Sequence, residues 1–312
     1  MQNFDLHMHT TYCDGKDSAE VMVLSAIENG LAFAGISGHS FTPHDQSYCM
    51  SREGTQRYIE EISALKQKYA DQITLLLGTE MDRYADIDLS PYDYYIGSVH
   101  YIFSDEGIKK REEILARHGG GAAGGASDQE TAASDAEIET LAKYEDWSPV
   151  DDGPEDLQRF AENYDGLMDV AEMYFETVGE VVSATNCDVI GHFDLITKFN
   201  EPVEIFDTSD ERYIAAWKKA IDRIFDDCAE RFKSGFRNRL ETLGVLEAGD
   251  KPVFEINTGA ISKGYRTVPY PSADQISYIK SKGGLLILSS DSHAAGTICN
   301  GFGDFSDLAT CQ

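Results

Sequence analysis

The chain alternates short apolar segments with amphipathic segments along most of its length, and this alternation constrains the fold more than any other feature. The apolar segments have the composition of strands and lie at 4–9, 31–37, 73–78, 94–100, 189–194, 253–258 and 285–289. Helical patterns lie between them, most clearly at 53–69, 211–234 and 272–282. Strands separated by helices form parallel sheets, because each helix returns the chain to the same end of the sheet. The sequence therefore predicts an α/β fold with a mostly parallel sheet.

Histidines and acids are concentrated where the predicted strands end. Of the eight histidines, six lie at such ends, and three carboxylates occupy equivalent positions. The nine candidates are His7, His9, Asp14, His39, Glu80, His100, His192, Asp291 and His293. The carboxyl ends of the strands of a parallel barrel converge on one face, so residues far apart in sequence can share one site there. We expect these nine side chains to meet.

Imidazoles and carboxylates in this number are typical of a metal centre. His7 and His9 alternate on an extended segment, which sends both rings to the same side. One zinc ion would use only three or four ligands, whereas the full set suits two to three clustered divalent ions, with a carboxylate such as Glu80 bridging a pair. Mixed sets of this kind accept zinc (Zn), iron (Fe) or manganese (Mn).

The charge balance excludes some partners. The chain has 26 basic and 55 acidic residues, a formal net charge of -29, which repels long nucleic acids and anionic membranes. Its six cysteines show no C-x-x-C spacing, and neither a signal peptide nor an apolar run long enough to span a membrane is visible. We expect a cytoplasmic protein that acts on a small molecule; the sequence leaves its oligomeric state open.

One stretch interrupts the alternation. From about 104 to 157 the chain is acidic and rich in glycine and alanine, with a low-complexity run at 119–126. We interpret residues 1–312 as a single domain with an insertion at about 104–157. The insertion could be a solvated excursion or a lid over the site.

The motifs at the strand ends resemble those of the polymerase-and-histidinol-phosphatase (PHP) phosphoesterase superfamily, and most closely its stand-alone histidinol-phosphatases. The resemblance rests on His7-x-His9 with Asp14-Gly15, Gly38-His39, Gly78-Thr79-Glu80, Ser98-Val99-His100, Gly191-His192-x-Asp194 and Asp291-Ser292-His293. It implies a distorted (β/α)7 barrel with a trinuclear metal site at the carboxyl ends of its strands.

The resemblance also implies a division of the ligands among three ions. His7 and His9 would bind the first ion with Glu80 and Asp291, Glu80 would bridge to a second ion held by His100 and His192, and the third would be held by Asp14, His39 and His293. Two positions differ from the family pattern, Cys13 and Gly38. Gly38 lacks a carboxylate that could orient His39.

The activity implied by the resemblance is hydrolysis of a small phosphorylated alcohol, with L-histidinol phosphate as the substrate. Asp291, His293 and Asp194 are candidates for proton transfer, together with water. Arg266 and Lys263 follow a strand end and are our candidates for binding the phosphate, with Lys198 and Arg52 as weaker ones. His44 and His118 are taken as ordinary loop histidines.

Three other readings remain open at this stage. A PHP enzyme could act on another phosphomonoester, a nucleotide or a short oligonucleotide, although the acidic surface disfavours long nucleic acids. The chain could be a non-catalytic metal-binding module, but it retains all nine candidate ligands. An amidohydrolase-like enzyme also begins with His-x-His, yet no lysine stands at a mid-barrel strand end as that class would require.

Overall fold

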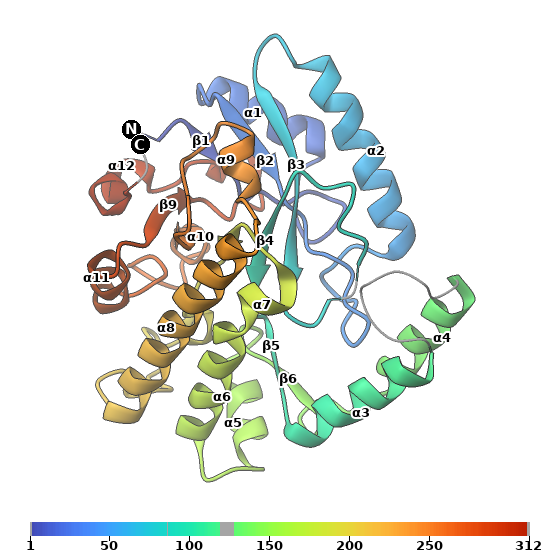
Figure 1. Ribbon diagram of the computed structural model, residues 1–312, viewed down its shortest axis with the longest axis vertical. Coiled ribbons are helices and arrows are strands. Elements are labelled where there is room, and N and C mark those ends of the chain that lie inside the picture. Colours follow the sequence, from blue (N-terminus) through green and yellow to red (C-terminus); the bar gives the residue numbers. More distant parts are fainter. Residues whose placement is uncertain (1, 86, 119–127, 311–312) are drawn as a thin grey trace.

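The computed structural model describes residues 2–85, 87–118 and 128–310. Its centre is a seven-stranded sheet whose neighbouring strands are all parallel, in the order β1-β2-β3-β4-β7-β8-β9. The strands are β1 Phe4–Asp5, β2 Phe33–Ile36, β3 Thr74–Asp82, β4 Tyr94–Ser98, β7 Val189–Ile190, β8 Val253–Asn257 and β9 Leu285–Ser289. Figure 1 shows the sheet at the centre with helices packed around its outside.

The first and last strands meet, which nearly closes the sheet into a barrel. Met8 forms a parallel bridge with Ser292, and the His9 amide donates to the Ser292 carbonyl at 2.8 Å. The Gln2 side chain adds a second link, donating to the Leu288 carbonyl at 2.7 Å and accepting from the Leu288 amide at 2.8 Å. The predicted (β/α)7 barrel is therefore confirmed.

Helices connect the strands and cover the barrel. They are α1 Ala19–Glu28, α2 Arg52–Lys68, α3 Asp105–Arg117, α4 Asp128–Ile138, α5 Pro154–Ala161, α6 Leu167–Gly179, α7 Val181–Thr185, α8 Glu211–Lys233, α9 Arg239–Thr242, α10 Gly259–Ser262, α11 Ala273–Ser281 and α12 Phe302–Phe305. Several of them begin with a serine side chain that accepts a hydrogen bond from an amide of the first turn. Ser18 accepts from the Val21 amide before α1, and Ser51 accepts from the Gly54 amide before α2. None of the helices in the described part of the chain has the length and apolar character needed to cross a membrane.

The alternating side chains of the strands build two separate cores. In β3, Leu75 and Leu77 belong to the large cluster that packs the outer helices. Leu76, between them, points the opposite way into a smaller cluster with Tyr94 and Leu240, as the two-residue period of a strand requires. This smaller cluster fills the barrel away from the carboxyl ends of the strands and leaves those ends for polar side chains.

Two elements differ from the sequence expectation. The first strand is only Phe4–Asp5, because the chain beyond it joins the barrel through the single bridge at Met8. The sequence at 165–185 has a helical pattern that predicts one helix, but the structure divides it into α6 and α7 at Glu180, whose amide donates to the Thr177 and Val178 carbonyls in a C-cap.

The insertion predicted at 104–157, called the excursion below, contains α3, α4 and β6 Trp147–Pro149. This strand pairs antiparallel with β5 Tyr101–Phe103 in a small second sheet. It has its own apolar cluster, with Trp147 and Ile138 buried against Tyr101. Its low-complexity run at 119–126 lies outside the described residues. The strand at the end of the excursion, β6, pairs with β5, and β5 follows directly after β4 in the chain. The end of the excursion therefore lies beside the carboxyl ends of the barrel strands.

Candidate metal centre

The carboxylate of Glu80, at the end of β3, is surrounded by imidazoles. Glu80 is 1% exposed, and its two oxygens lie within 3.4 Å of ring nitrogens from five histidines. The distances are 3.0 Å to His7 Nε2, 3.4 Å to His9 Nε2, 3.0 Å to His39 Nδ1, 3.1 Å to His100 Nε2 and 2.7 Å to His192 Nε2. The five histidines come from four separate strand ends, so this carboxylate is in position to bridge two ions.

The remaining candidates complete the cluster on one side. Asp14 Oδ2 lies 3.0 Å from His293 Nε2, and Asp14 Oδ1 lies 3.7 Å from His39 Nε2. Asp291 Oδ1 lies 3.3 Å from His9 Nε2. The structure therefore brings all nine side chains expected from the sequence into one cluster.

Within the cluster, three groups have ligand atoms close enough together to hold an ion. They are His9, Asp14, His39 and His293; His7, His9 and Asp291; and His39, Glu80 and His100. The groups overlap, and the division differs in detail from the one that the resemblance implied. His9 also reaches Asp14, and His39 also reaches Glu80.

Close backbone packing positions Asp291. Its φ of 47° is a left-handed conformation that residues other than glycine seldom adopt, and strain of this kind is concentrated at functional sites. Gly259 packs against it, and a Cβ at that position would lie 2.6 Å from Asp291 Oδ2. Any larger residue at 259 would displace this carboxylate.

The electrostatics of the cluster favour ionised carboxylates. Burial alone would raise the pKa of Glu80, but His39, His7 and His100 outweigh it and hold this pKa well below its usual value. The pKa of Asp291 is also well below its usual value, because Lys263 and His7 overcome the effect of burial. The pKa of His9 is lowered well below its usual value, first by burial and then by the positive charge of the nearby His293. This shift favours the neutral imidazole.

Two further acids support the cluster and were missed by the sequence analysis. Glu255 Oε1 lies 2.7 Å from His7 Nδ1, on the ring edge opposite the one that faces Glu80. Asp82 Oδ2 lies 3.4 Å from His100 Nδ1 and accepts from the His100 amide at 2.9 Å. Such contacts fix the orientation of a ligating imidazole. The signal available in the sequence was a charged residue inside an apolar strand, Phe254-Glu255-Ile256.

The positions of Cys13 and Gly38 are connected. Cys13 Sγ lies 3.6 Å from His9 Nδ1, and a Cβ at Gly38 would lie 3.2 Å from that sulfur. The thiol therefore occupies space that a side chain at 38 would need. Burial raises the pKa of Cys13 to about 12, which favours the neutral thiol.

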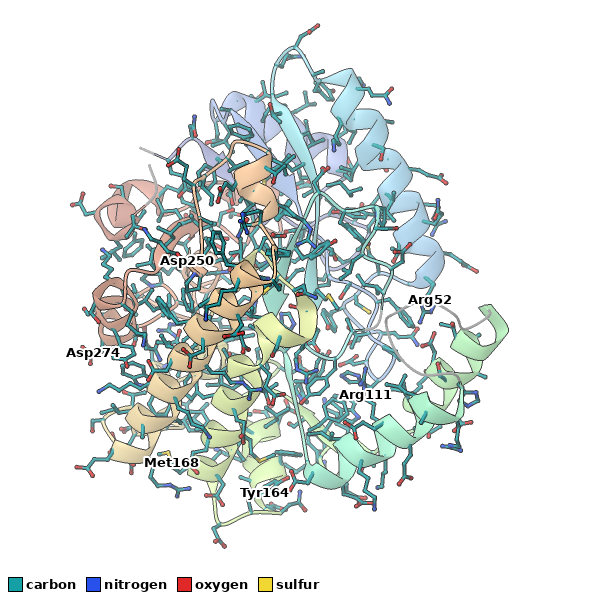
Figure 2. All side chains as sticks on the ribbon, viewed as in Figure 1. Arg52, Arg111, Tyr164, Met168, Asp250 and Asp274 are labelled. Atoms are coloured by element: carbon teal, nitrogen blue, oxygen red, sulfur yellow. The ribbon has the colours of Figure 1, made fainter. Side chains whose placement is uncertain are left out.

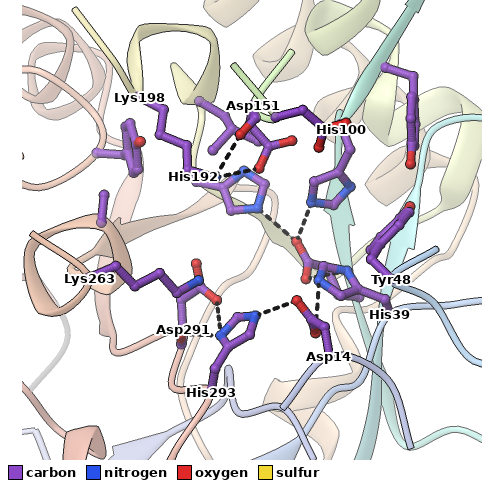
Figure 3. A pocket seen from close by; sticks show the side chains of 16 residues that line it. Asp14, His39, Tyr48, His100, Asp151, His192, Lys198, Lys263, Asp291 and His293 are labelled. Carbon is purple, nitrogen blue, oxygen red and sulfur yellow. Dashed lines mark hydrogen bonds and ion pairs between the residues drawn. The ribbon is translucent and has the colours of Figure 1, made fainter. Parts of the chain in front are cut away.

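A pocket of about 190 Å³ opens over the cluster, and Figure 3 shows its lining. Lys198 and Lys263 lie on one side, and Tyr48 lies across the pocket from them. Lys198 Nζ donates to the backbone carbonyl of Asp151 at 2.8 Å and to its Oδ2 at 3.0 Å. Asp151 belongs to the excursion, so this segment contributes to the wall of the pocket.

Two of the predicted site residues are not brought to this pocket. Asp194 and Arg266 line a neighbouring cavity of about 710 Å³. Burial raises the pKa of Asp194, and Arg266 opposes that rise. The Arg266 guanidinium is held in place, because it donates to Thr197 Oγ1 and covers the Tyr270 ring at 4.3 Å from the centroid. Of the two predicted phosphate-binding residues, only Lys263 lines the metal-site pocket.

Of the two weaker phosphate candidates, Lys198 lines the pocket, whereas Arg52 and the two loop histidines, His44 and His118, lie elsewhere. Arg52 begins α2 on the surface, where Figure 2 labels it, and its Nε lies 2.6 Å from Asp135 Oδ2. His44 is buried against Tyr101, Phe103 and Trp147. His118 Nε2 lies 2.8 Å from Glu137 on the excursion. None of these three residues lines the pocket.

Comparisons with known proteins agree with this geometry. A family model described as the PHP domain matches residues 5–180, more than half of the chain. A protein named probable histidinol-phosphatase from Schizosaccharomyces pombe is 26% identical over 248 residues, which is 76% of this chain and 59% of that protein. A Bacillus subtilis histidinol-phosphatase is 27% identical over 124 residues, which is 34% of this chain and 46% of that protein. The chain thus spans about half of the length of these curated relatives.

Solved structures show the same fold. A candidate histidinol phosphatase from Listeria monocytogenes superposes with a TM-score of 0.67 at 18% identity, over 97% of this chain and 99% of that one. The histidinol phosphate phosphatase from Lactococcus lactis, complexed with zinc, L-histidinol and phosphate, superposes with a TM-score of 0.58 at 19% identity. That superposition covers 98% of this chain and 92% of the other. At such identities the likeness establishes the barrel fold.

Proposed function

Because this chain belongs to the PHP domain family, we propose that it is a metal-dependent phosphomonoesterase that hydrolyses L-histidinol phosphate to L-histidinol and phosphate. The observation that carries the proposal is the set of five imidazoles around the buried carboxylate of Glu80. Burying so many ionisable groups together is costly, and divalent cations bound by them would compensate that cost. The names of the Schizosaccharomyces pombe and Bacillus subtilis histidinol-phosphatases and of both structural neighbours point to the same substrate.

The donor set fits divalent cations. His9 Nε2 is buried without a hydrogen-bond partner among the described residues, although it lies 3.4 Å from Glu80 and 3.3 Å from Asp291. A cation shared by these three side chains would satisfy the nitrogen. The three overlapping groups of ligands would hold two to three ions, and their mixture of imidazole and carboxylate suits zinc, iron or manganese.

Divalent ions at such a site supply Lewis acidity and lower the pKa of water from about 15.7 toward neutrality. The side chains of the protein supply the rest. Glu255 and Asp82 fix the rings of His7 and His100, so that the ligating nitrogens face Glu80. Asp291 and His293 line the pocket and are the residues proposed for proton transfer, whereas Asp194 lies in the neighbouring cavity.

One lysine of the pocket, Lys263, is proposed to hold the phosphate. Lys263 is exposed to solvent and lines the pocket. Among the nearby charges, its ammonium group lowers the pKa of Asp291 the most. Lys198 lies nearby but already pairs with Asp151. Lys263 is therefore the cation with freedom to bind a phosphoryl oxygen, and it replaces Arg266 in this role.

The test is a phosphate-release screen of the purified, metal-quantified protein against L-histidinol phosphate and a panel of other phosphomonoesters. We expect roughly two to three ions per chain from the ligand count and the highest kcat/KM for histidinol phosphate. His100→Ala should abolish most turnover with the fold retained, whereas His118→Ala, which changes a histidine outside the pocket, should leave turnover unchanged. A metal-loaded protein that releases phosphate from no ester would refute the proposal.

A further inference from the structure

Asp151 is a pocket residue whose position the barrel motifs do not explain. It follows β6 at the end of the excursion, and the backbone holds it beside a metal-site histidine. The Val150 amide donates to the His100 carbonyl at 2.9 Å, and Tyr101 pairs with Pro149 in the small sheet. The location of Asp151 therefore depends on main-chain pairing directly beside His100.

The side chain of Asp151 is held from one direction only. Lys198 Nζ binds its Oδ2 at 3.0 Å and its backbone carbonyl at 2.8 Å, and Figure 3 shows this pair on the side of the pocket next to His192. The other oxygen, Oδ1, accepts no hydrogen bond from the described residues, and Asp151 lines the pocket. A carboxylate oxygen thus remains available to a ligand in the reaction pocket.

The charge of this oxygen restricts what can bind there. An ionised carboxylate beside a phosphate site repels the phosphate, because like charges at short range cost free energy in a partly buried pocket. It attracts a cationic group carried by the same ligand. A phosphate ester with an ammonium group close to its ester oxygen offers an anion to Lys263 and a cation to Asp151 at once.

We propose that Asp151 binds the ammonium group of the substrate and makes the enzyme selective for phosphate esters of 2-amino alcohols. In such esters only two carbon atoms separate the ammonium nitrogen from the ester oxygen, so an ammonium beside Asp151 keeps the phosphoryl group near the metal site. The inference rests on the proposed function and extends it, because it assigns recognition of the amine to the excursion rather than to the barrel.

The experiment compares two esters that differ only in the amine, O-phosphoethanolamine and ethyl phosphate, with histidinol phosphate as a third. Asp151→Asn keeps the size of the side chain and an oxygen for Lys198 while removing the negative charge. We expect kcat/KM for both amine esters to fall roughly tenfold to a hundredfold, the range for a lost charge-assisted hydrogen bond. The value for ethyl phosphate should stay within about threefold or rise, since a repulsive charge is removed.

Asp226→Asn is the matched control, because it makes the same change at an exposed position of α8. Metal content and melting temperature of both variants should equal those of the wild type. An equal loss for ethyl phosphate and the amine esters in Asp151→Asn would overturn the proposal.

Calorimetric binding of the two simple esters separates this inference from the proposed function. If the wild type hydrolyses none of the esters, the proposed function fails, and binding still decides the role of Asp151. A wild-type preference for the amine ester that disappears in Asp151→Asn supports the inference. Equal affinity of the wild type for both esters refutes it.

Discussion

Replacing Glu255 with glutamine should weaken metal binding and destabilise the fold, although the change conserves the shape of the side chain. Glu255 is 1% exposed, and its carboxylate accepts four hydrogen bonds. Oε1 receives His7 Nδ1 at 2.7 Å and Ser289 Oγ at 2.8 Å, while Oε2 receives the His192 amide and Asn257 Nδ2, both at 3.1 Å. A glutamine keeps one of these oxygens and presents an amide nitrogen in place of the other.

The size of the effect follows from that count. In either orientation of the glutamine, two donors lose their acceptor and face the N–H groups of the amide instead. Because a hydrogen bond to a charged group contributes about 1.5–3 kcal/mol, the free energy of unfolding should fall by roughly 3–6 kcal/mol. His7 also loses the partner that orients its ring, which for a metal-ligating histidine lowers metal affinity by about 10–100-fold.

The assay pairs metal competition against a chelator with urea unfolding of the metal-free protein. Glu241→Gln is the control, because Glu241 uses only one oxygen, Oε2, to accept from the Ala248 and Gly249 amides far from the cluster. A glutamine there keeps that acceptor, so both measurements should match the wild type. If Glu255→Gln also matched the wild type in both, the assignment of Glu255 as the residue that positions His7 would be refuted.

Three further outcomes are expected. Burial lowers the pKa of His44 to about 4, so below about pH 6.5 the unfolded chain binds more protons than the folded protein. The free energy of unfolding should therefore fall as the pH drops from about 6.5 to about 4. The free energy of unfolding should fall by about 3 kcal/mol over this pH range. Urea titrations of His44→Phe should lack this part of the pH dependence, and the same pH dependence in the variant and the wild type would contradict the prediction. Arg266→Ala should lower the free energy of unfolding by roughly 1–3 kcal/mol, because Thr197 loses a buried hydrogen-bond donor and the positive charge near buried Asp194 is removed. An unchanged urea midpoint with a raised KM would instead place Arg266 on the substrate. Lys263→Ala should raise the KM for a phosphomonoester by roughly tenfold through loss of a charge-assisted contact. Lys280→Ala, which removes an exposed lysine of α11, should leave the KM unchanged, and equal kinetics for the two variants would exclude Lys263 from phosphate binding.

Much of the candidate site could be predicted from local patterns. A strand followed by a histidine or an acid is visible within a few residues, and in a parallel barrel every such position lies on the same face. His7, Glu80, His192 and Asp291 could therefore be assigned to one cluster without coordinates, although they span most of the chain. The barrel itself follows from the same alternation of strand and helix.

The partners of these residues could not be predicted, because they depend on contacts between distant segments. Glu255 supports a histidine 248 positions away, and that pairing depends on how β8 and β1 are placed around the barrel. Arg266 follows a strand end as a phosphate ligand would, yet packing turns its guanidinium onto Tyr270 and away from the pocket.

By itself the sequence determined which residue types gather at the open end of the barrel, since a two-residue strand period and a helical return fix the end at which each side chain emerges. Only the tertiary structure decided which of them face one another. Asp151 shows the reason, because it lies in an excursion without barrel periodicity and reaches the pocket through the pairing of β5 with β6. Such pairing depends on contacts across the fold that a local pattern does not contain.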